Sequence, residues 1–233
     1  MPKSLNNNSS TLILFDIDYT LFDVNKFRRK IFKIIKNMAL GKEIKNIDSM
    51  LREAYIVSRK DTGYFSLRTF LEYILTGLKV QVPIETLEKE ILKEDLFTGN
   101  LYKEAKNVLR TLAKNKSLRI GIFSAGDFFQ RKKVKEIEDF LNREHVHIFV
   151  KKHKELPAII KLYKKYKLYI VDDMLKILRT AKLLNKNVFT IWVKRKKFAR
   201  QAEEITDFMP DAIVANLKEI PKLVTISIKL QLD

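Results

Sequence analysis

An uncharged apolar run that ends in two aspartates constrains this chain more than any other stretch. Residues 12–15 read Leu-Ile-Leu-Phe, and Asp16 and Asp18 follow. A short apolar run of this kind is typical of a fully buried strand. Side chains alternate along a strand, so both carboxylates are expected on one side, at the end where open α/β sheets bind ligands. Carboxylates this close repel each other, and a hard cation such as Mg²⁺ relieves the repulsion.

The composition narrows the class of protein. The chain has 233 residues, 46% of them hydrophobic, which is enough for a sizeable buried core. It has no cysteine, which excludes disulfides, thiolate catalysis and cysteine-based zinc sites. The first residues are polar, and the apolar run after them is broken by Asp16, unlike a signal peptide or a membrane span. These features predict a cytoplasmic protein that makes no membrane contact.

The chain is strongly basic. Lys and Arg number 46 and Asp and Glu 28, which gives a net charge of +18. Such an excess favours acidic partners, either small phosphorylated substrates or nucleic acid. Because the excess occurs in every segment beyond the first strand, a lysine-rich solvated surface is favoured over a nucleic-acid groove, which would gather its charge on one face.

The periodicity of apolar residues divides the chain. Between residues 25 and 98 apolar residues recur at helical spacing, which predicts a module of about four helices. From residue 101, helix-like and strand-like segments alternate, which predicts parallel strands joined by right-handed crossovers. Strands are expected at 118–123, 146–150, 168–171, 187–193 and 212–214. The sequence therefore predicts an α/β fold: a Rossmann-like parallel-sheet core over 1–24 and 99–233, with an inserted all-helical cap over 25–98.

The C-terminal segment has a different pattern. From Val224 to Asp233, apolar and polar residues alternate strictly. This alternation predicts an extra edge strand or a surface that pairs with a second subunit. The sequence does not choose between them, and the oligomeric state stays open.

The first acidic strand end also carries a family resemblance. Asp16-Ile17-Asp18-Tyr19-Thr20 resembles the DxDxT motif of the haloacid dehalogenase-like hydrolases, most of which are phosphatases. Tyr19 stands where that family usually has glycine. The alternative is a pair of capping or turn aspartates after a core strand, because Asp and Thr favour local hydrogen bonds.

Three later strand ends resemble the other motifs of this family. Ser124-Ala125-Gly126 follows a predicted strand with a hydroxyl and small residues, which lets backbone N–H groups approach a phosphate. Asp172 and Asp173 follow another strand. The family's third motif requires a cation between the third and fourth strands, here between the predicted strands 146–150 and 168–171. Lys151, Lys152 and Lys154 compete for that role. Lys154 is preferred because Lys154-Glu155-Leu156-Pro157 resembles the family's Lys-x-x-Pro arrangement, with Lys152 in reserve.

The resemblance implies a magnesium-dependent phosphatase that acts on a small phosphorylated substrate. Asp16 would be the nucleophile and Asp18 the general acid and base, and the acid at Asp18 favours phosphate chemistry over dehalogenation. The implied phosphate-binding groups are Thr20, Ser124, Ala125 and Lys154. The implied Mg²⁺ ligands are Asp16, the main-chain carbonyl of Asp18, Asp172 and Asp173.

Alternatives remain for both the reaction and the substrate. A sugar-phosphate mutase of the same fold would return the phosphoryl group to a sugar. A basic nucleic-acid-binding protein, or a phosphatase of polynucleotide ends, would use the excess positive charge. Candidate substrate contacts in the cap are Arg52, Arg59, Lys60 and Arg68, although lysine and arginine are most often simple surface charges.

Overall fold

The computed structural model describes residues 10–38, 47–60, 65–78, 82–195, 205 and 207–229. Its core is a six-stranded parallel sheet in the order β3-β2-β1-β4-β5-β6. The strands are β1 (Thr11–Phe15), β2 (Leu118–Ala125), β3 (Val146–Phe149), β4 (Lys167–Asp172), β5 (Phe189–Val193) and β6 (Ala212–Val214). The predicted α/β fold is therefore confirmed.

Strand β1 lies at the centre of the sheet, and all five of its residues are buried. It pairs in parallel with β2 on one side and β4 on the other. A strand covered on both faces needs apolar residues at every position, which explains its continuous rather than alternating pattern. The three strands that carry the acidic and hydroxyl motifs are thus adjacent in space although far apart in sequence.

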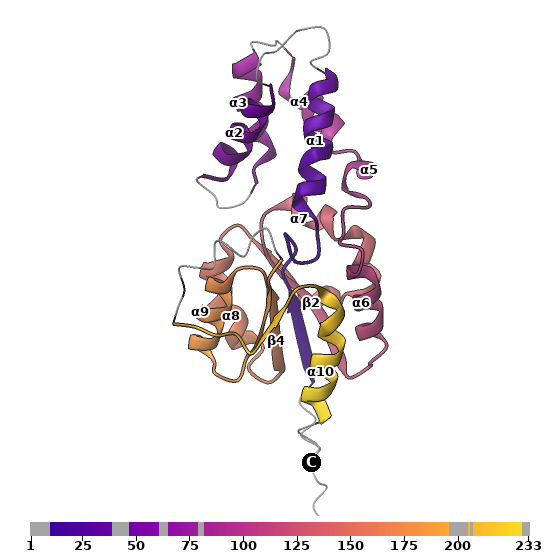
Figure 1. Ribbon diagram of the computed structural model, residues 1–233, viewed down its shortest axis with the longest axis vertical. Coiled ribbons are helices and arrows are strands. Elements are labelled where there is room, and N and C mark those ends of the chain that lie inside the picture. Colours follow the sequence, from indigo (N-terminus) through magenta and orange to yellow (C-terminus); the bar gives the residue numbers. More distant parts are fainter. Residues whose placement is uncertain are drawn as a thin grey trace, which may run out of the picture.

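Helices cover both faces of the sheet (Figure 1). On one face, α6 (Ala105–Ala113) and α10 (Ile220–Lys229) share a core with the side chains of Ile13 and Phe15. On the other, α8 (Lys152–Leu162) and α9 (Leu175–Leu184) share a core with Leu12 and Leu14. The alternation of β1 side chains between the two cores fixes the register of the sheet.

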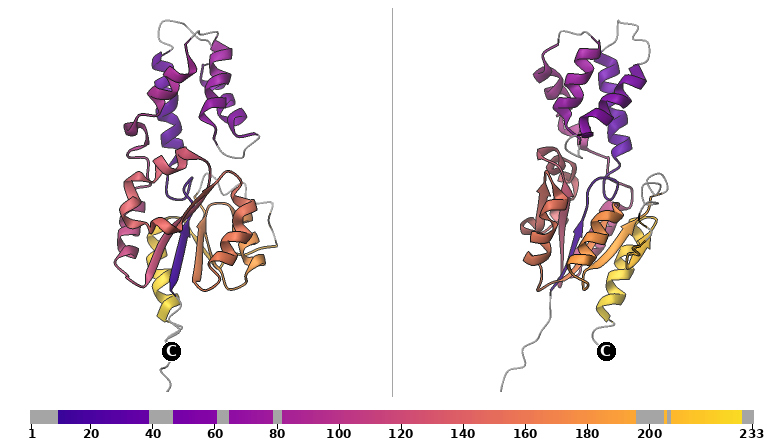
Figure 2. Two further views of the ribbon diagram at one scale, coloured as in Figure 1. Left: turned by 180° about the vertical axis from the view of Figure 1, so that it is seen from behind. Right: turned by 90° about the vertical axis from the view of Figure 1, so that its left-hand side faces the viewer.

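Five further helices stand over the carboxyl edge of the sheet (Figure 2). They are α1 (Val24–Met38), α2 (Ile47–Lys60), α3 (Leu67–Leu78), α4 (Ile84–Ile91) and α5 (Glu94–Phe97). Two chain segments connect these helices to the core, and the two segments are hydrogen-bonded to each other. Asp23 N donates to Asn100 O at 2.7 Å, and Tyr102 N donates to Leu21 O at 2.9 Å. We keep residues 25–98 as the proposed limits of the cap.

The C-terminal alternation does not form a strand over the residues that the structure describes. Helix α10 includes residues 224–229, whereas residues 230–233 lie outside the described part of the chain. Ile220 and Val224 are buried at a spacing of four, which places both on the helix face that packs on α6. The expectation of an edge strand is therefore wrong over residues 224–229, which are helical. The alternative, a surface that pairs with a second subunit, stays a prediction.

The segment that follows β2 is not one continuous helix. It forms α7 (Phe128–Lys133) and a 3-10 helix, η1 (Lys135–Phe140). Two further 3-10 helices are η2 (Arg143–His145) and η4 (Leu217–Glu219). Among the described residues, no helix has the length and apolar character needed to cross a membrane.

Candidate active site

The carboxyl ends of three adjacent strands bring the predicted motifs together. Asp16 follows β1, Ser124 lies near the end of β2 and Asp172 ends β4. All three are buried, with exposed fractions of 7%, 1% and 1%. The Ser124 hydroxyl donates to Asp16 Oδ1 at 3.0 Å. Parallel strands align their carboxyl ends at one edge of a sheet, so the topology alone explains this meeting.

A lysine lies between the two aspartates. Lys152 Nζ donates to Asp16 Oδ1 at 2.7 Å and to Asp172 Oδ2 at 2.5 Å, and the side chain is only 4% exposed. Lys154 and Lys151 are exposed on the same stretch. The preference for Lys154 is therefore revised to Lys152. The reason is helical phase: α8 begins at Lys152, so a step of two residues turns Lys154 away from the sheet.

The close approach of buried charges shifts the pKa values of Asp16 and Lys152. Burial, helped by Asp172 and opposed by Lys152, raises the pKa of Asp16 to about 7. Burial alone would lower the pKa of Lys152, but the carboxylates of Asp16 and Asp172 outweigh it and raise that pKa above its ordinary value. Lys152 thus stays charged, and one cation faces more than one carboxylate.

A third carboxylate completes an acidic cluster. Asp16, Asp172 and Asp173 each offer an oxygen atom, and these atoms all lie within 4.8 Å of one another. Burial, together with the charges of Asp16 and Asp172, raises the pKa of Asp173 well above its ordinary value. Carboxylate oxygens converging at such short range are the ligands that Mg²⁺ prefers, so the residues present fit a divalent cation. The side chain of Asp18 is not part of this cluster.

The carboxylate of Asp18 instead meets a buried lysine. Lys133 Nζ donates to both of its oxygens, at 2.7 and 2.9 Å. Lys133 is 5% exposed and its ammonium group also lies 5.4 Å from the Phe22 ring and 5.8 Å from the Phe27 ring. Sequence reasoning missed this residue. The signal available was Gln130-Arg131-Lys132-Lys133, which resembles the segment after the second motif in part of the family.

The predicted phosphate-binding groups fall into two sets. Ser124 and Ala125 lie at the site, where Gln130 Nε2 donates to Ser124 Oγ at 3.2 Å and to Ala125 O at 2.8 Å. Gly126 has φ +147°, and a Cβ there would lie 2.1 Å from Gln130 Cγ, so only glycine fits. Thr20, by contrast, is fully buried, and its hydroxyl has no hydrogen-bond partner among the described residues.

The loop of the first motif is strained and held by one arginine. Tyr19 has φ +61°, a left-handed conformation that costs a bulky residue about 1–2 kcal/mol. Arg195 donates to Tyr19 O at 3.1 Å and to Thr20 O at 3.0 Å, and it pairs with Glu104 at 2.9 Å. Its guanidinium carbon also lies 3.4 Å from the centre of the Tyr102 ring. Arg195 therefore links this loop to the return segment from the cap.

Replacing Arg195 by Met is expected to lower kcat about tenfold or more while KM changes little, because the loop that presents Asp18 loses its two carbonyl contacts. Arg195→Lys should recover only part of the loss, since an ammonium group cannot reproduce the planar contacts. Steady-state kinetics of both variants check this, with the exposed Arg110→Met as the matched control. A KM effect alone would contradict a positioning role.

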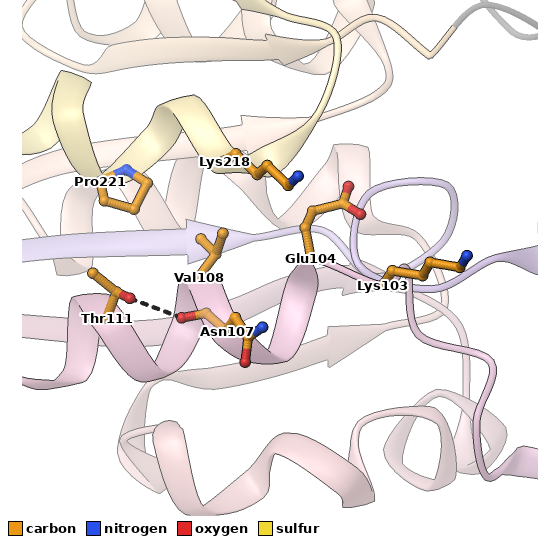
Figure 3. A pocket seen from close by; sticks show the side chains of 7 residues that line it. All are labelled: Lys103, Glu104, Asn107, Val108, Thr111, Lys218 and Pro221. Atoms are coloured by element: carbon orange, nitrogen blue, oxygen red, sulfur yellow. Dashed lines mark hydrogen bonds between the residues drawn. The ribbon is translucent and has the colours of Figure 1, made fainter.

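A separate groove of about 620 Å³ lies between α6 and α10 (Figure 3). The residues that line it include Lys103, Glu104 and Lys218. None of the acidic strand ends contributes to it. The acidic cluster at the strand ends is therefore separate from this groove. Glu104 connects the two regions, because it lines the groove and pairs with Arg195.

Comparisons with solved structures agree with this fold. A protein from Burkholderia xenovorans described as a haloacid dehalogenase-like hydrolase matches with TM-score 0.70 and 20% identity, over 94% of this chain and 98% of that one. A HAD-hydrolase from Bacillus subtilis bound to magnesium matches with TM-score 0.63 and 12% identity, over 92% and 98%. A HAD phosphatase from Thermococcus onnurineus matches with TM-score 0.55 and 18% identity, over 92% and 97%.

Other structures that match are 2-haloacid dehalogenases. Neither a scan against protein-family models nor a search of curated proteins found a match. The chain has the fold of the haloacid dehalogenase-like hydrolases, which confirms the resemblance at the level of fold. At these identities the neighbours do not define the reaction.

Proposed function

We propose that this protein is a magnesium-dependent phosphatase that hydrolyses a phosphomonoester through an aspartyl-phosphate intermediate. The observation that carries the proposal is the buried contact of Lys152 with both Asp16 and Asp172, with Asp173 beside them. Buried charges are costly unless they are paired. Carboxylates that converge at one point provide a binding site for a cation, and a buried lysine beside them can contact an anionic substrate. Mg²⁺ bound by Asp16, Asp172 and Asp173 would neutralise charge on the phosphoryl group.

The chain's own residues account for the chemical steps. A carboxylate oxygen of Asp16 attacks phosphorus, and the bond from phosphorus to the leaving oxygen breaks. Asp18 gives a proton to that oxygen, and an alcohol leaves. Water then attacks phosphorus, Asp18 takes its proton, and cleavage of the acyl phosphate restores Asp16 and releases phosphate. Lys152 and the Ser124 hydroxyl lie against Asp16, where they would hold the phosphoryl oxygens.

The direct test is hydrolysis of 4-nitrophenyl phosphate by the purified protein with and without Mg²⁺. The proposal predicts turnover that depends on Mg²⁺ and stops with excess chelator. Steeply salt-dependent binding of DNA or RNA without turnover would instead support the nucleic-acid alternative. Transfer of phosphate between positions of a sugar phosphate, without release of inorganic phosphate, would support the mutase.

Asp18→Ala is expected to reduce hydrolysis of alkyl phosphates by about 10²–10⁴-fold, the usual contribution of a general acid. The loss should be smaller for nitrophenyl esters, because a nitrophenolate departs without a proton. The measurement is kcat/KM for a series of esters with increasing leaving-group pKa. An equal loss across the series would contradict the acid role of Asp18.

Magnesium affinity should depend on pH because the ion competes with a proton at Asp16. Burial raises the pKa of this carboxyl to about 7, so below that pH the proton must leave before the ion binds. Apparent affinity should therefore fall by about tenfold for each unit below pH 7 and level off above it. Titration calorimetry over a pH range that brackets this pKa measures the effect, and a constant affinity over that range would contradict the assignment.

A further inference from the structure

Two tyrosines connect the catalytic loop to the cap. Tyr19, in the first motif, is half-buried, and its phenol is hydrogen-bonded to that of Tyr55 in α2. The left-handed backbone of Tyr19, held by Arg195, directs this large side chain towards the cap. Strain retained at a catalytic loop is a reason to look for function in the side chain that it positions.

Two arginines of the cap flank this pair. The guanidinium carbon of Arg28, in α1, lies 5.2 Å from the centre of the Tyr55 ring, and that of Arg59, in α2, lies 5.8 Å from it. Both side chains are half-buried. Because Tyr55 is hydrogen-bonded to Tyr19, both arginines lie against the ring that contacts the first motif.

The acid of the first motif is paired with a lysine of the core rather than with the cap. Lys133 contacts both carboxylate oxygens of Asp18. The hydrogen bond of Arg28 goes to a neutral group, Asn25 Oδ1, at 3.1 Å. The other cap residues predicted as substrate contacts lie elsewhere: Lys60 is exposed, Arg52 donates to Asp48 O and Arg68 pairs with Glu72.

We propose that Tyr19, Tyr55, Arg28 and Arg59 form the subsite for the leaving group, and that this leaving group carries an anion of its own, either a carboxylate or a second phosphate. This inference rests on the proposed phosphatase function. Guanidinium groups bind both anions through paired hydrogen bonds, and the phenols add neutral donors. The substrate class is thus a phosphomonoester with a second negative group beyond the ester oxygen.

Matched three-carbon esters test the inference. The carboxylate arm compares the phosphate esters of 3-hydroxypropionate and 3-hydroxypropionamide, and the phosphate arm compares propane-1,3-diol bisphosphate with the monophosphate. The wild-type protein should favour the anionic member of at least one pair by at least about tenfold in kcat/KM, the value of one charged hydrogen bond. Arg28→Met and Arg59→Met should each reduce that preference to within about threefold, whereas Arg52→Met, on the exposed side of α2, should preserve it.

The outcomes separate this inference from the function on which it rests. Hydrolysis of 4-nitrophenyl phosphate with no anionic preference in either arm overturns the subsite and leaves the phosphatase intact. A preference that survives both Arg28→Met and Arg59→Met also overturns it. No Mg²⁺-dependent hydrolysis of any ester, including 4-nitrophenyl phosphate, overturns both. Circular dichroism melting of each variant confirms that a loss of preference is not a loss of fold.

Discussion

Asp16→Asn is expected to abolish magnesium-dependent hydrolysis, with a loss of at least about 10⁴-fold, because an amide neither attacks phosphorus nor carries charge for the ion. The variant keeps the size of the side chain, so we expect β1 and its pairing to be preserved. Kinetics with 4-nitrophenyl phosphate measure the loss. Activity near that of the wild type would remove Asp16 as the nucleophile.

The folding control for Asp16→Asn depends on the pKa of Asp16. Burial raises this pKa from its ordinary value of 3.8 to about 7. Asp16 therefore favours the folded state below pH 3.8, and this contribution is lost as the pH rises towards 7. Without Mg²⁺, and at a pH above the raised pKa of Asp16, the Asp16→Asn variant should have a melting temperature equal to or higher than that of the wild type. Mg²⁺ should stabilise the wild type much more than the variant.

Lys152→Met is expected to lower kcat by about 10³-fold, since the phosphoryl oxygens lose the buried ammonium partner beside Asp16. Lys154→Met, two residues along the same helix and exposed, should leave kcat within about twofold. The pair is a matched comparison because both changes remove one positive charge from α8. Equal losses, or a loss confined to Lys154→Met, would contradict the placement of Lys152.

Lys152→Met also removes the cation between two buried carboxylates, which typically costs about 3–5 kcal/mol of stability. Mg²⁺ should restore part of that loss by replacing the missing charge. Lys152→Arg keeps a charge at this position and supplies the test when the Met variant does not fold. Because a guanidinium is larger and planar, we expect at least about a tenfold loss of kcat in this variant as well.

The features that were predictable from the sequence are those that depend on strand ends. Periodicity placed Asp16, Ser124 and Asp172 at the ends of predicted parallel strands, which meet at one edge of a sheet. The resemblance to the family motifs supplied the role expected of each residue. The choice among the three lysines depended on where α8 begins, and helix limits are uncertain by one or two residues in any sequence pattern. An error of this size in the start of α8 is enough to select Lys154 in place of Lys152 as the lysine that faces the site.

Long-range contacts were beyond sequence reasoning. Lys133 and Asp18 are 115 residues apart. The resemblance of residues 130–133 to a family segment drew attention to Lys133 but did not indicate that it contacts Asp18. Arg195 and Tyr19 are 176 residues apart, and their contact depends on the unusual backbone of Tyr19. The C-terminal segment shows a different limit: its short alternating pattern fits both a strand and the helix that packs on α6.

The central claim is that phosphate passes through a covalent bond to Asp16. Acid quenching during turnover, followed by borohydride reduction and peptide mass spectrometry, detects such a bond because reduction converts an aspartyl phosphate to homoserine. We predict homoserine at position 16 and unmodified aspartate at positions 18, 172 and 173. Steady hydrolysis with homoserine absent from position 16, or present at one of the other three, would contradict the mechanism.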